Sequence, residues 1–433
     1  MPREVPVLSA ISFAVAIGFG VVAPAIPVFA RQFGVGHTAA AAVISAFAFM
    51  RFVSALSGGR LVDRWGERKV LTVGMFFVAG STALAGLSQN YLQLLLLRAV
   101  GGIGSAMFTV AAVSLLLRVT PAAQRGRASG LWQGGFLIGG LMGPVVGGFL
   151  TEVSTRLPFF VYGAALSIAG VIGMMFLAKA SLHDRERDTD SDAALERTTL
   201  REAFRNKAYQ AALVCNLGTG WALFGVRSSL VPLFVIEGIK LGAIWIGIGF
   251  LVGSAVQSAL LLPAGRFVDT VGRRPAMILG GLLSMAAMLI VTFSTALPSY
   301  LLAMALFGVG SAYLGVAPGA VVGDVVRGRS GQLVAVFQMA ADLGAIVGPL
   351  VAGLLADSLS FGAAFGATAG VLIFGPLLAL RMPETRWSQG DTPVVAASAE
   401  VPLGTPANDA GPEAAAAATE ISRSQDGRQG PSA

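Results

Sequence analysis

Twelve long apolar segments divide this chain, and they constrain its fold more than any other feature. Each is 19–28 residues long, and a helix of roughly 18–25 residues is long enough to cross a hydrocarbon core of about 30 Å. Inside a membrane, only helices and closed barrels satisfy all their backbone polar groups. The segments lie near residues 7–29, 39–60, 70–88, 91–117, 128–150, 158–178, 209–236, 242–265, 275–295, 298–322, 331–356 and 361–380. The sequence therefore predicts an all-α membrane protein with twelve transmembrane helices.

The composition argues against several other classes of protein. Only 12% of the residues are charged, whereas a soluble domain carries about 25%. The single cysteine, Cys215, excludes an internal disulfide framework, and two histidines, His37 and His183, are too few to favour a metal site. No phosphate-binding G-K-[ST] loop is present, which argues against ATP-driven transport. We therefore expect no metal, no bound cofactor and no enzymatic activity.

The distribution of lysine and arginine predicts the orientation of the chain. Of 30 such residues, 24 lie at the termini or in even-numbered loops. The odd-numbered loops contain only Arg31, Arg156 and Lys240. Positive residues accumulate on the cytoplasmic side of a membrane. We therefore expect a multi-pass protein of the cell (plasma) membrane with both termini in the cytoplasm. The formal charge of +7 then indicates topology and attraction to anionic lipid rather than nucleic-acid binding.

The two halves of the chain repeat one another at an offset of 205 or 206 residues. GRLVDRWGERK at 59–69 matches GRFVDTVGRRP at 265–275, and RAVGGIGSA at 98–106 matches MALFGVGSA at 304–312. Residues 19–29 also match residues 224–234. Gln133 and the glycines that follow it match Gln338 and the glycines that follow that residue. Parallel repeats of this kind are typical of transporters whose substrate site lies between the halves near the bilayer midplane.

The repeat predicts two pseudo-twofold-related six-helix bundles. We assign the first bundle to residues 1–180 and the second to residues 209–385. The polar stretch 181–208 is expected to be a cytoplasmic central loop. Residues 386–433 are rich in Ala, Pro, Gly and Ser and are expected to form a disordered cytoplasmic tail.

Three motifs resemble those of a known family, the major facilitator superfamily. The repeated loop resembles its G-x-L-x-D-R-x-G-R-[KR] signature, and residues 98–106 resemble its R-x-x-x-G-x-G-x-A pattern. In the fifth span, the spacing of the glycines resembles the stripe of the family's twelve-span drug:proton antiporters; the residues are Gly130, Gly139, Gly143, Pro144, Gly147 and Gly148. The resemblance implies a monomeric secondary transporter in membrane lipid that takes a small-molecule substrate and is driven by a proton gradient.

The resemblance also implies a cytoplasmic gate in the repeated loop. Asp63 is expected to approach the start of span eleven, where a helix N-terminus favours a carboxylate, and Asp269 to approach span five equivalently. Gly66 is expected to allow a tight turn before span three. The gate residues are Gly59, Asp63, Arg64, Gly66, Arg68, Lys69, Asp269, Gly272 and Arg273. The alternative is a plain basic loop with a turn glycine.

Two embedded charges are candidates for proton coupling. Asp342 is the one acidic residue placed deep inside a predicted span, and burial there brings proton uptake toward physiological pH. Arg98 lies in span four, and its repeat equivalent is Met304, so the fold does not require this charge. The alternative for Asp342 is a structural hydrogen bond. Many drug antiporters carry an acid in span one where this chain has Val15, which puts a two-acid relay in doubt.

Further residues are candidates for the substrate cavity: Arg51, Arg227, Asn216, Gln133, Gln338 and Phe136. With three embedded arginines, the cavity is expected to bind amphiphilic anions or neutral lipophiles, or else the arginines pair with Asp342, carbonyl groups or water. The leading prediction is a proton-coupled exporter of small amphiphilic compounds. An importer or facilitator on the same fold is the alternative, with the glycines serving packing only. A non-transporting receptor or scaffold is a more distant one.

Overall fold

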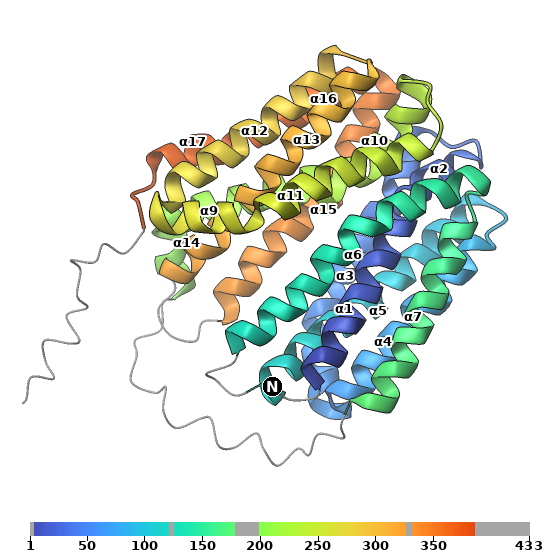
Figure 1. Ribbon diagram of the computed structural model, residues 1–433, viewed down its shortest axis with the longest axis horizontal. Coiled ribbons are helices and arrows are strands. Elements are labelled where there is room, and N and C mark those ends of the chain that lie inside the picture. Colours follow the sequence, from blue (N-terminus) through green and yellow to red (C-terminus); the bar gives the residue numbers. More distant parts are fainter. Residues whose placement is uncertain (1–3, 121–124, 178–198, 326–330, 386–433) are drawn as a thin grey trace, which may run out of the picture. The chain divides into compact units, whose positions relative to one another are not determined.

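The computed structural model describes residues 4–120, 125–177, 199–325 and 331–385. Within these ranges it contains helices and no strand. Twelve helical stretches are long and apolar enough to cross a membrane, which confirms the predicted all-α membrane protein. The predicted tail and most of the central loop lie outside the described residues. Figure 1 shows the helices of the first half (blue to green) beside those of the second half (yellow-green to red).

The first half provides six spans from seven helices. A break at Pro24 divides the first span into two helices, because proline has no backbone N–H to continue the ladder. The helices are α1 (Glu4–Val22), α2 (Ala25–Arg31), α3 (His37–Trp65), α4 (Glu67–Gly86), α5 (Tyr91–Val119), α6 (Arg125–Val153) and α7 (Leu157–Phe176).

The second half provides the other six spans. The seventh span includes two π-helical segments, η3 and η4, and the tenth and twelfth spans are each broken once. The elements are α8 (Leu200–Arg205), α9 (Lys207–Thr219), η3 (Gly220–Val226), α10 (Arg227–Leu233), η4 (Phe234–Gly238), α11 (Ile244–Thr270), α12 (Arg273–Phe293), α13 (Leu297–Leu314), α14 (Ala317–Val325), α15 (Gly331–Ser358), α16 (Phe361–Leu372) and α17 (Phe374–Arg381).

The internal repeat is visible as the same close helix contact in both halves. A methyl group on Gly104 would lie 2.7 Å from the carbonyl oxygen of Gly74, where α5 crosses α4. At the equivalent crossing of α13 and α12, a methyl group on Gly310 would also lie 2.7 Å from the carbonyl oxygen of Gly280. Both pairs are 206 residues apart in the sequence. Because small residues let membrane helices approach closely, the repeated glycines fix the same packing twice.

The two bundles meet along two helix pairs, α3 with α15 and α6 with α11. The repeat places α3 on α11 and α6 on α15, so the two contacts are related by the pseudo-twofold axis. The helices in each pair run antiparallel. One end of both pairs is marked by the start of α3 and is called the His37 end here. The opposite end, marked by the turn between α3 and α4, is called the Gly66 end.

Candidate functional site

An ion pair joins the two bundles near the middle of the α3–α15 contact. Arg51, on α3, donates through Nη2 to Oδ1 of Asp342, on α15. The Arg51 side chain is 38% exposed and that of Asp342 19% exposed, so the pair is partly accessible. Toward the His37 end, the Ser45 hydroxyl donates to the Ile346 carbonyl oxygen at 2.7 Å. Of the alternatives for Arg51, the structure therefore shows the pairing with Asp342.

The Arg51–Asp342 pair has no counterpart in the α6–α11 contact. The repeat places Gln257 at the position of Arg51 and Leu137 at that of Asp342. The α3–α15 contact therefore has two charged residues at these positions, and the equivalent α6–α11 contact has none. Embedded charges are costly, and packing alone does not require this pair, so it is the strongest functional candidate at the midplane.

Arg98 lies apart from this pair, inside the first bundle. Its side chain is 2% exposed, and its guanidinium carbon is 4.5 Å from the centre of the Phe47 ring. Nε and Nη1 have no hydrogen-bond partner within the described part of the chain. The structure thus pairs Asp342 with Arg51 rather than with Arg98, and a coupling role for Arg98 stays a prediction.

Arg227 is buried inside the second bundle. Its Nη2 donates to the Phe250 carbonyl oxygen at 3.2 Å and to the Ser254 hydroxyl at 3.3 Å. The guanidinium carbon also lies 4.6 Å from the centre of the Phe250 ring. The second predicted cavity arginine is therefore held by a carbonyl, a hydroxyl and an aromatic face of α11.

The uncharged cavity candidates are dispersed. Asn216 donates to the Phe337 carbonyl oxygen at 2.7 Å, which joins α9 to α15 within the second bundle. Phe136 packs edge-on against Trp132, with ring centres 5.2 Å apart, in the apolar core of the first bundle. Gln338 is exposed on α15, one turn before Asp342. The side chain of Gln133 lies outside the described residues.

Three glycines of the predicted stripe seat α1 against α6. A methyl group on Gly139, Gly143 or Gly147 would lie 2.4–2.6 Å from a backbone carbonyl oxygen of α1. Contacts this short leave no room for a side chain. These positions are therefore required for packing, whether or not they also serve transport.

The rest of the stripe faces the second bundle. A methyl group on Gly148 would lie 3.0 Å from the Cα of Gly247 on α11, and one on Gly247 would lie 2.5 Å from the carbonyl oxygen of Pro144. The stripe thus brings α6 close to both α1 and α11. Gly130 lies outside the part of α6 whose surroundings are described.

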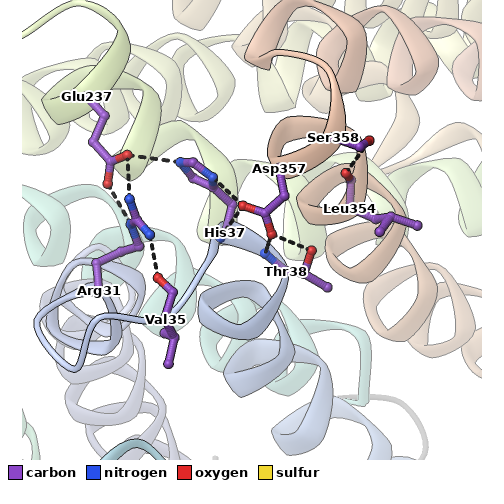
Figure 2. A network of polar contacts seen from close by, with 8 residues as sticks. All are labelled: Arg31, Val35, His37, Thr38, Glu237, Leu354, Asp357 and Ser358. Atoms are coloured by element: carbon purple, nitrogen blue, oxygen red, sulfur yellow. Dashed lines mark hydrogen bonds and ion pairs between the residues drawn. The ribbon is translucent and has the colours of Figure 1, made fainter.

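At the His37 end, a carboxylate of one bundle caps a helix of the other. Asp357, near the end of α15, accepts hydrogen bonds from the backbone N–H groups of His37 (2.7 Å) and Thr38 (2.8 Å) and from the Thr38 hydroxyl (2.7 Å). The residue before α3 is Gly36, which has no side chain to cap the helix itself. We call this contact, shown in Figure 2, the α15–α3 latch.

The same contact recurs in the other helix pair. Glu152, at the end of α6, accepts a hydrogen bond from the Ile244 backbone N–H, the first residue of α11, at 3.2 Å. The repeat equivalents of Asp357 and Thr38 are Glu152 and Ile244. We call this contact the α6–α11 latch. Both latches rely on the attraction of a carboxylate to the free amide groups and dipole of a helix start.

A third contact at the His37 end is a bidentate ion pair between the two bundles. Arg31, at the end of α2, donates to both carboxylate oxygens of Glu237 in η4, at 2.8 and 3.0 Å. Arg31 belongs to the first bundle and Glu237 to the second, so this ion pair is another charged contact between the bundles.

Part of the predicted cytoplasmic gate lies outside the described residues. This holds for Gly59, for the Asp63 side chain, and for the segments that Asp63 and Asp269 are predicted to approach, residues 326–332 and 121–130. Arg64 and Lys69 are exposed at the Gly66 end. The predicted gate contacts of Asp63 and Asp269 therefore stay predictions.

The turn predicted at Gly66 is present, and it is repeated. Gly66 has φ of 82° and its equivalent Gly272 has φ of 138°. Residues with a Cβ avoid this region, which explains glycine at both positions. Each glycine immediately precedes a helix, α4 or α12.

The arginine two places after each turn binds the end of another helix of its own bundle. Arg68 donates through Nη2 to the Met174 carbonyl oxygen, in the last turn of α7. Arg274, its equivalent, donates to the Leu380 carbonyl oxygen at the end of α17, at 2.7 Å. A cation at a helix C-terminus complements the dipole there. In this conformation these arginines stabilise the bundles rather than crossing between them.

A further ion pair at the Gly66 end occurs in both halves with its charges exchanged. In the first half, Arg118 Nη2 lies 3.3 Å from Glu67 Oε2; in the second, Arg273 Nε lies 3.0 Å from Asp324 Oδ2. Glu67 is the equivalent of Arg273, and Arg118 of Asp324. Asp269, whose side chain is 72% exposed, approaches Arg273 at 3.5 Å.

Sequence reasoning missed the latches of the His37 end, although the repeat carried a signal for them. Glu152 and Asp357 are separated by 205 residues, and Gly36 and Gly242 by 206, so each latch has an acid and a glycine at the repeat offset. These are single residues rather than strings, and only the packing of the helices brings each acid to its glycine.

Comparison with known proteins identifies a family model that matches most of the chain and relatives that match about half of it. The family model of the Major Facilitator Superfamily matches residues 8–260 and 244–407. Quinolone resistance protein NorA of Staphylococcus aureus (strain MRSA252) is 27% identical over 191 residues, which is 44% of this chain and 48% of the relative. Multidrug resistance protein 1 of Bacillus subtilis (strain 168) is 28% identical over 253 residues, 56% of this chain and 62% of the relative. These alignments thus span roughly half of each relative.

Solved structures share the fold at low sequence identity. A bacterial homologue of the human lysosomal transporter Spinster, in an inward-facing and unoccupied conformation, matches with a TM-score of 0.73 and 17% identity, over 89% of this chain and 99% of that chain. A mutant of the nucleoside transporter NupG matches with a TM-score of 0.69 and 13% identity, over 88% of this chain and 100% of that chain. These matches establish the architecture alone.

Proposed function

This chain belongs to the Major Facilitator Superfamily, a family of transporters rather than enzymes, and from that premise we propose that it is a proton-coupled antiporter that exports small amphiphilic or lipophilic compounds. The relatives named for quinolone and multidrug resistance support the export of drug-like molecules. The glycine stripe of α6, which resembles that of drug:proton antiporters, supports the same direction of transport.

The observation that carries the proposal is the Arg51–Asp342 ion pair at the boundary between the bundles. Protonation of Asp342 removes the charge that holds Arg51, so proton binding weakens a contact between α3 and α15. Arg51 and Asp342 then keep at most a neutral hydrogen-bond acceptor in place of a charge-assisted one, which makes the contact sensitive to the protonation state. Proton binding at this site therefore biases how the bundles sit against each other, as an alternating-access antiporter requires.

We further propose that the Gly66 end faces the cytoplasm and the His37 end faces the outside of the plasma membrane. The excess of lysine and arginine in even-numbered loops supports this orientation. The α15–α3 and α6–α11 latches then close the external side, and the gate of Asp63 closes the cytoplasmic side in the opposite conformation. The transporter works as a monomer in lipid, and the proton gradient takes the place of a cofactor.

Everted membrane vesicles test the proposal. Vesicles acidified inside should accumulate a quinolone or a lipophilic dye, and collapse of the proton gradient should abolish the accumulation. Asp342→Asn should lose accumulation driven by the gradient while it keeps exchange of substrate down its own gradient. Glu202→Gln, which changes an exposed carboxylate of α8, is the matched control and should behave as the unmodified protein.

Each other outcome rejects a defined part of the proposal. Accumulation that persists without a proton gradient rejects coupling. Unchanged accumulation in Asp342→Asn removes Asp342 from the coupling role. Net flux in the opposite direction under the same gradient identifies an importer on this fold, in which the glycine stripe of α6 serves packing only.

A further inference from the structure

His37 lies between two carboxylates, and the proposed coupling at Asp342 does not account for it. Nε2 of its ring is 2.9 Å from Oε2 of Glu237, and Nδ1 is 2.7 Å from Oδ1 of Asp357. The three residues belong to α3, η4 and α15, so one imidazole bridges the two bundles, as Figure 2 shows. Its side chain is 15% exposed, whereas the two carboxylates are 30% and 31% exposed.

This geometry determines how many protons the ring needs. A neutral imidazole has one N–H group, and its other nitrogen is only an acceptor. An ionised carboxylate is also only an acceptor, so a neutral ring leaves one nitrogen lone pair facing a carboxylate oxygen at hydrogen-bond distance. With both nitrogens protonated, the ring donates to Glu237 and to Asp357 in charge-assisted hydrogen bonds.

The other neighbours of the ring favour the ionised form of both carboxylates. Arg31 of α2 contacts both oxygens of Glu237, and Asp357 accepts from the first amide groups of α3 and from the Thr38 hydroxyl. From α16, the ring of Phe361 packs edge-on at 4.9 Å and carries no charge. The cluster of Arg31, His37, Glu237 and Asp357 is therefore neutral overall with a protonated ring, and carries a net negative charge with a neutral one.

We propose that His37 is a proton-binding residue of the α15–α3 latch, and that this latch closes fully only while both ring nitrogens carry a proton. Separation of the bundles at this end removes both acceptors from the ring. By linkage, the closed state then binds the proton more tightly than the open state, and external acid favours closure. The inference rests on the alternating-access and orientation parts of the proposed function, and not on export or on coupling through Asp342.

The repeat provides an internal comparison. The equivalent of His37 in the second half is Ala243, so the α6–α11 latch has a carboxylate and a helix start but no titratable bridge. Only the α15–α3 latch therefore contains a histidine, the side chain whose ordinary charge change falls between about pH 5 and pH 8. Since the ring proton is exchanged with the side on which the latch opens, it does not cross the membrane. His37 therefore sets the dependence of the cycle on external pH and leaves the proton stoichiometry unchanged.

Distances between spin labels at the His37 end test the proposal without any transport measurement. The labels are placed on Gln89→Cys, between α4 and α5, and Thr295→Cys, between α12 and α13, after removal of the buried cysteine by Cys215→Ala. Asp342→Asn is included so that the midplane carboxyl does not titrate. In lipid nanodiscs, the ratio of closed to open molecules should fall about tenfold or more between about pH 5.5 and about pH 8.5. His37→Gln should abolish this dependence.

A pH response that persists in His37→Gln, or its absence in the protein that retains His37, overturns the proposal. A second measurement does not require replacement of this residue. His183→Gln leaves His37 as the one remaining histidine of the chain, so the ring ¹⁵N resonances report its protonation directly. Two protonated nitrogens are expected in the closed state at about neutral pH, and a neutral tautomer there contradicts the inference. Because neither readout uses substrate or flux, failure of export leaves this test intact.

Discussion

Replacing Asp357 by Asn should open the His37 end far more than replacing its repeat equivalent Glu152 by Gln. Asp357 accepts hydrogen bonds from the backbone N–H of His37 (2.7 Å), its ring Nδ1 (2.7 Å), the Thr38 backbone N–H (2.8 Å) and the Thr38 hydroxyl (2.7 Å). For Glu152, the corresponding contact is the hydrogen bond from Ile244 at 3.2 Å. The two substitutions remove the same charge from equivalent positions, so each is the control for the other.

The expected magnitudes follow from these contacts. Loss of a helix cap costs about 0.5–2 kcal/mol, and loss of a hydrogen bond to a charged group costs about 1.5–3 kcal/mol. The amide oxygen of Asn can still accept, so we expect the lower part of the combined range for Asp357→Asn, about 2 kcal/mol. Glu152→Gln loses the charge facing one helix start, about 0.3–1 kcal/mol. The closed-to-open ratio should therefore fall about thirtyfold in the first variant and at most about fivefold in the second.

The spin-labelled pair at positions 89 and 295 measures both ratios directly. The measurement is made at acidic pH, where the ring of His37 contributes most to closure. The reasoning is refuted if the two variants open the His37 end equally, or if Glu152→Gln opens it more. It is also refuted if Asp357→Asn leaves the distance distribution unchanged, because the latch then contributes nothing to closure.

Two further predictions concern stability. Gly143→Ala places a methyl group 2.5 Å from the Ile17 carbonyl oxygen and should lower the free energy of unfolding by about 1–3 kcal/mol. Gly140→Ala, which meets no atom within 4 Å, is the control and should leave it unchanged. Equal thermal-unfolding midpoints for the two variants contradict the packing assigned to the stripe. Glu67→Arg places a like charge beside Arg118 and should cost about 1–3 kcal/mol, and adding Arg118→Asp should recover most of it by copying the ion pair of the second half. Thermal unfolding measures both variants. If the double variant is no more stable than Glu67→Arg alone, the two ion pairs are not interchangeable.

The twelve spans could be predicted because apolar length and the absence of partners for backbone groups in lipid leave few other solutions. The division into two bundles could also be predicted from the sequence, because the repeat consists of contiguous stretches of matching residues. Gly66 was predictable because a tight turn between two spans requires a positive φ, as observed at 82°. Each of these features depends on local sequence or on its repetition.

The partners of the site residues were not predictable in this way. Three arginines, at positions 51, 98 and 227, were available to Asp342, and only the packing of α3 against α15 selects Arg51. His37 and Asp357 are separated by 320 residues, so nothing local joins them. The sequence did contain a signal for the latches, because single acids and glycines recur at the repeat offset. That signal identifies contacts only once the antiparallel pairs α3–α15 and α6–α11 are known.

The α3–α15 pair has an acid opposite a helix start at the His37 end, and the proposed gate would add a second at the Gly66 end. At the His37 end, Asp357 of α15 caps α3; at the other end, the proposed gate has Asp63 of α3 approaching the start of α15. His37 and Asp63 are 26 residues apart, about 39 Å along a helix, with Arg51 and Asp342 paired between them. If the two helices pivot about the Arg51–Asp342 pair in the proposed alternating-access cycle, closing one end separates the other. Under the proposed function the two caps are then mutually exclusive, and protonation of Asp342 would weaken the ion pair between them.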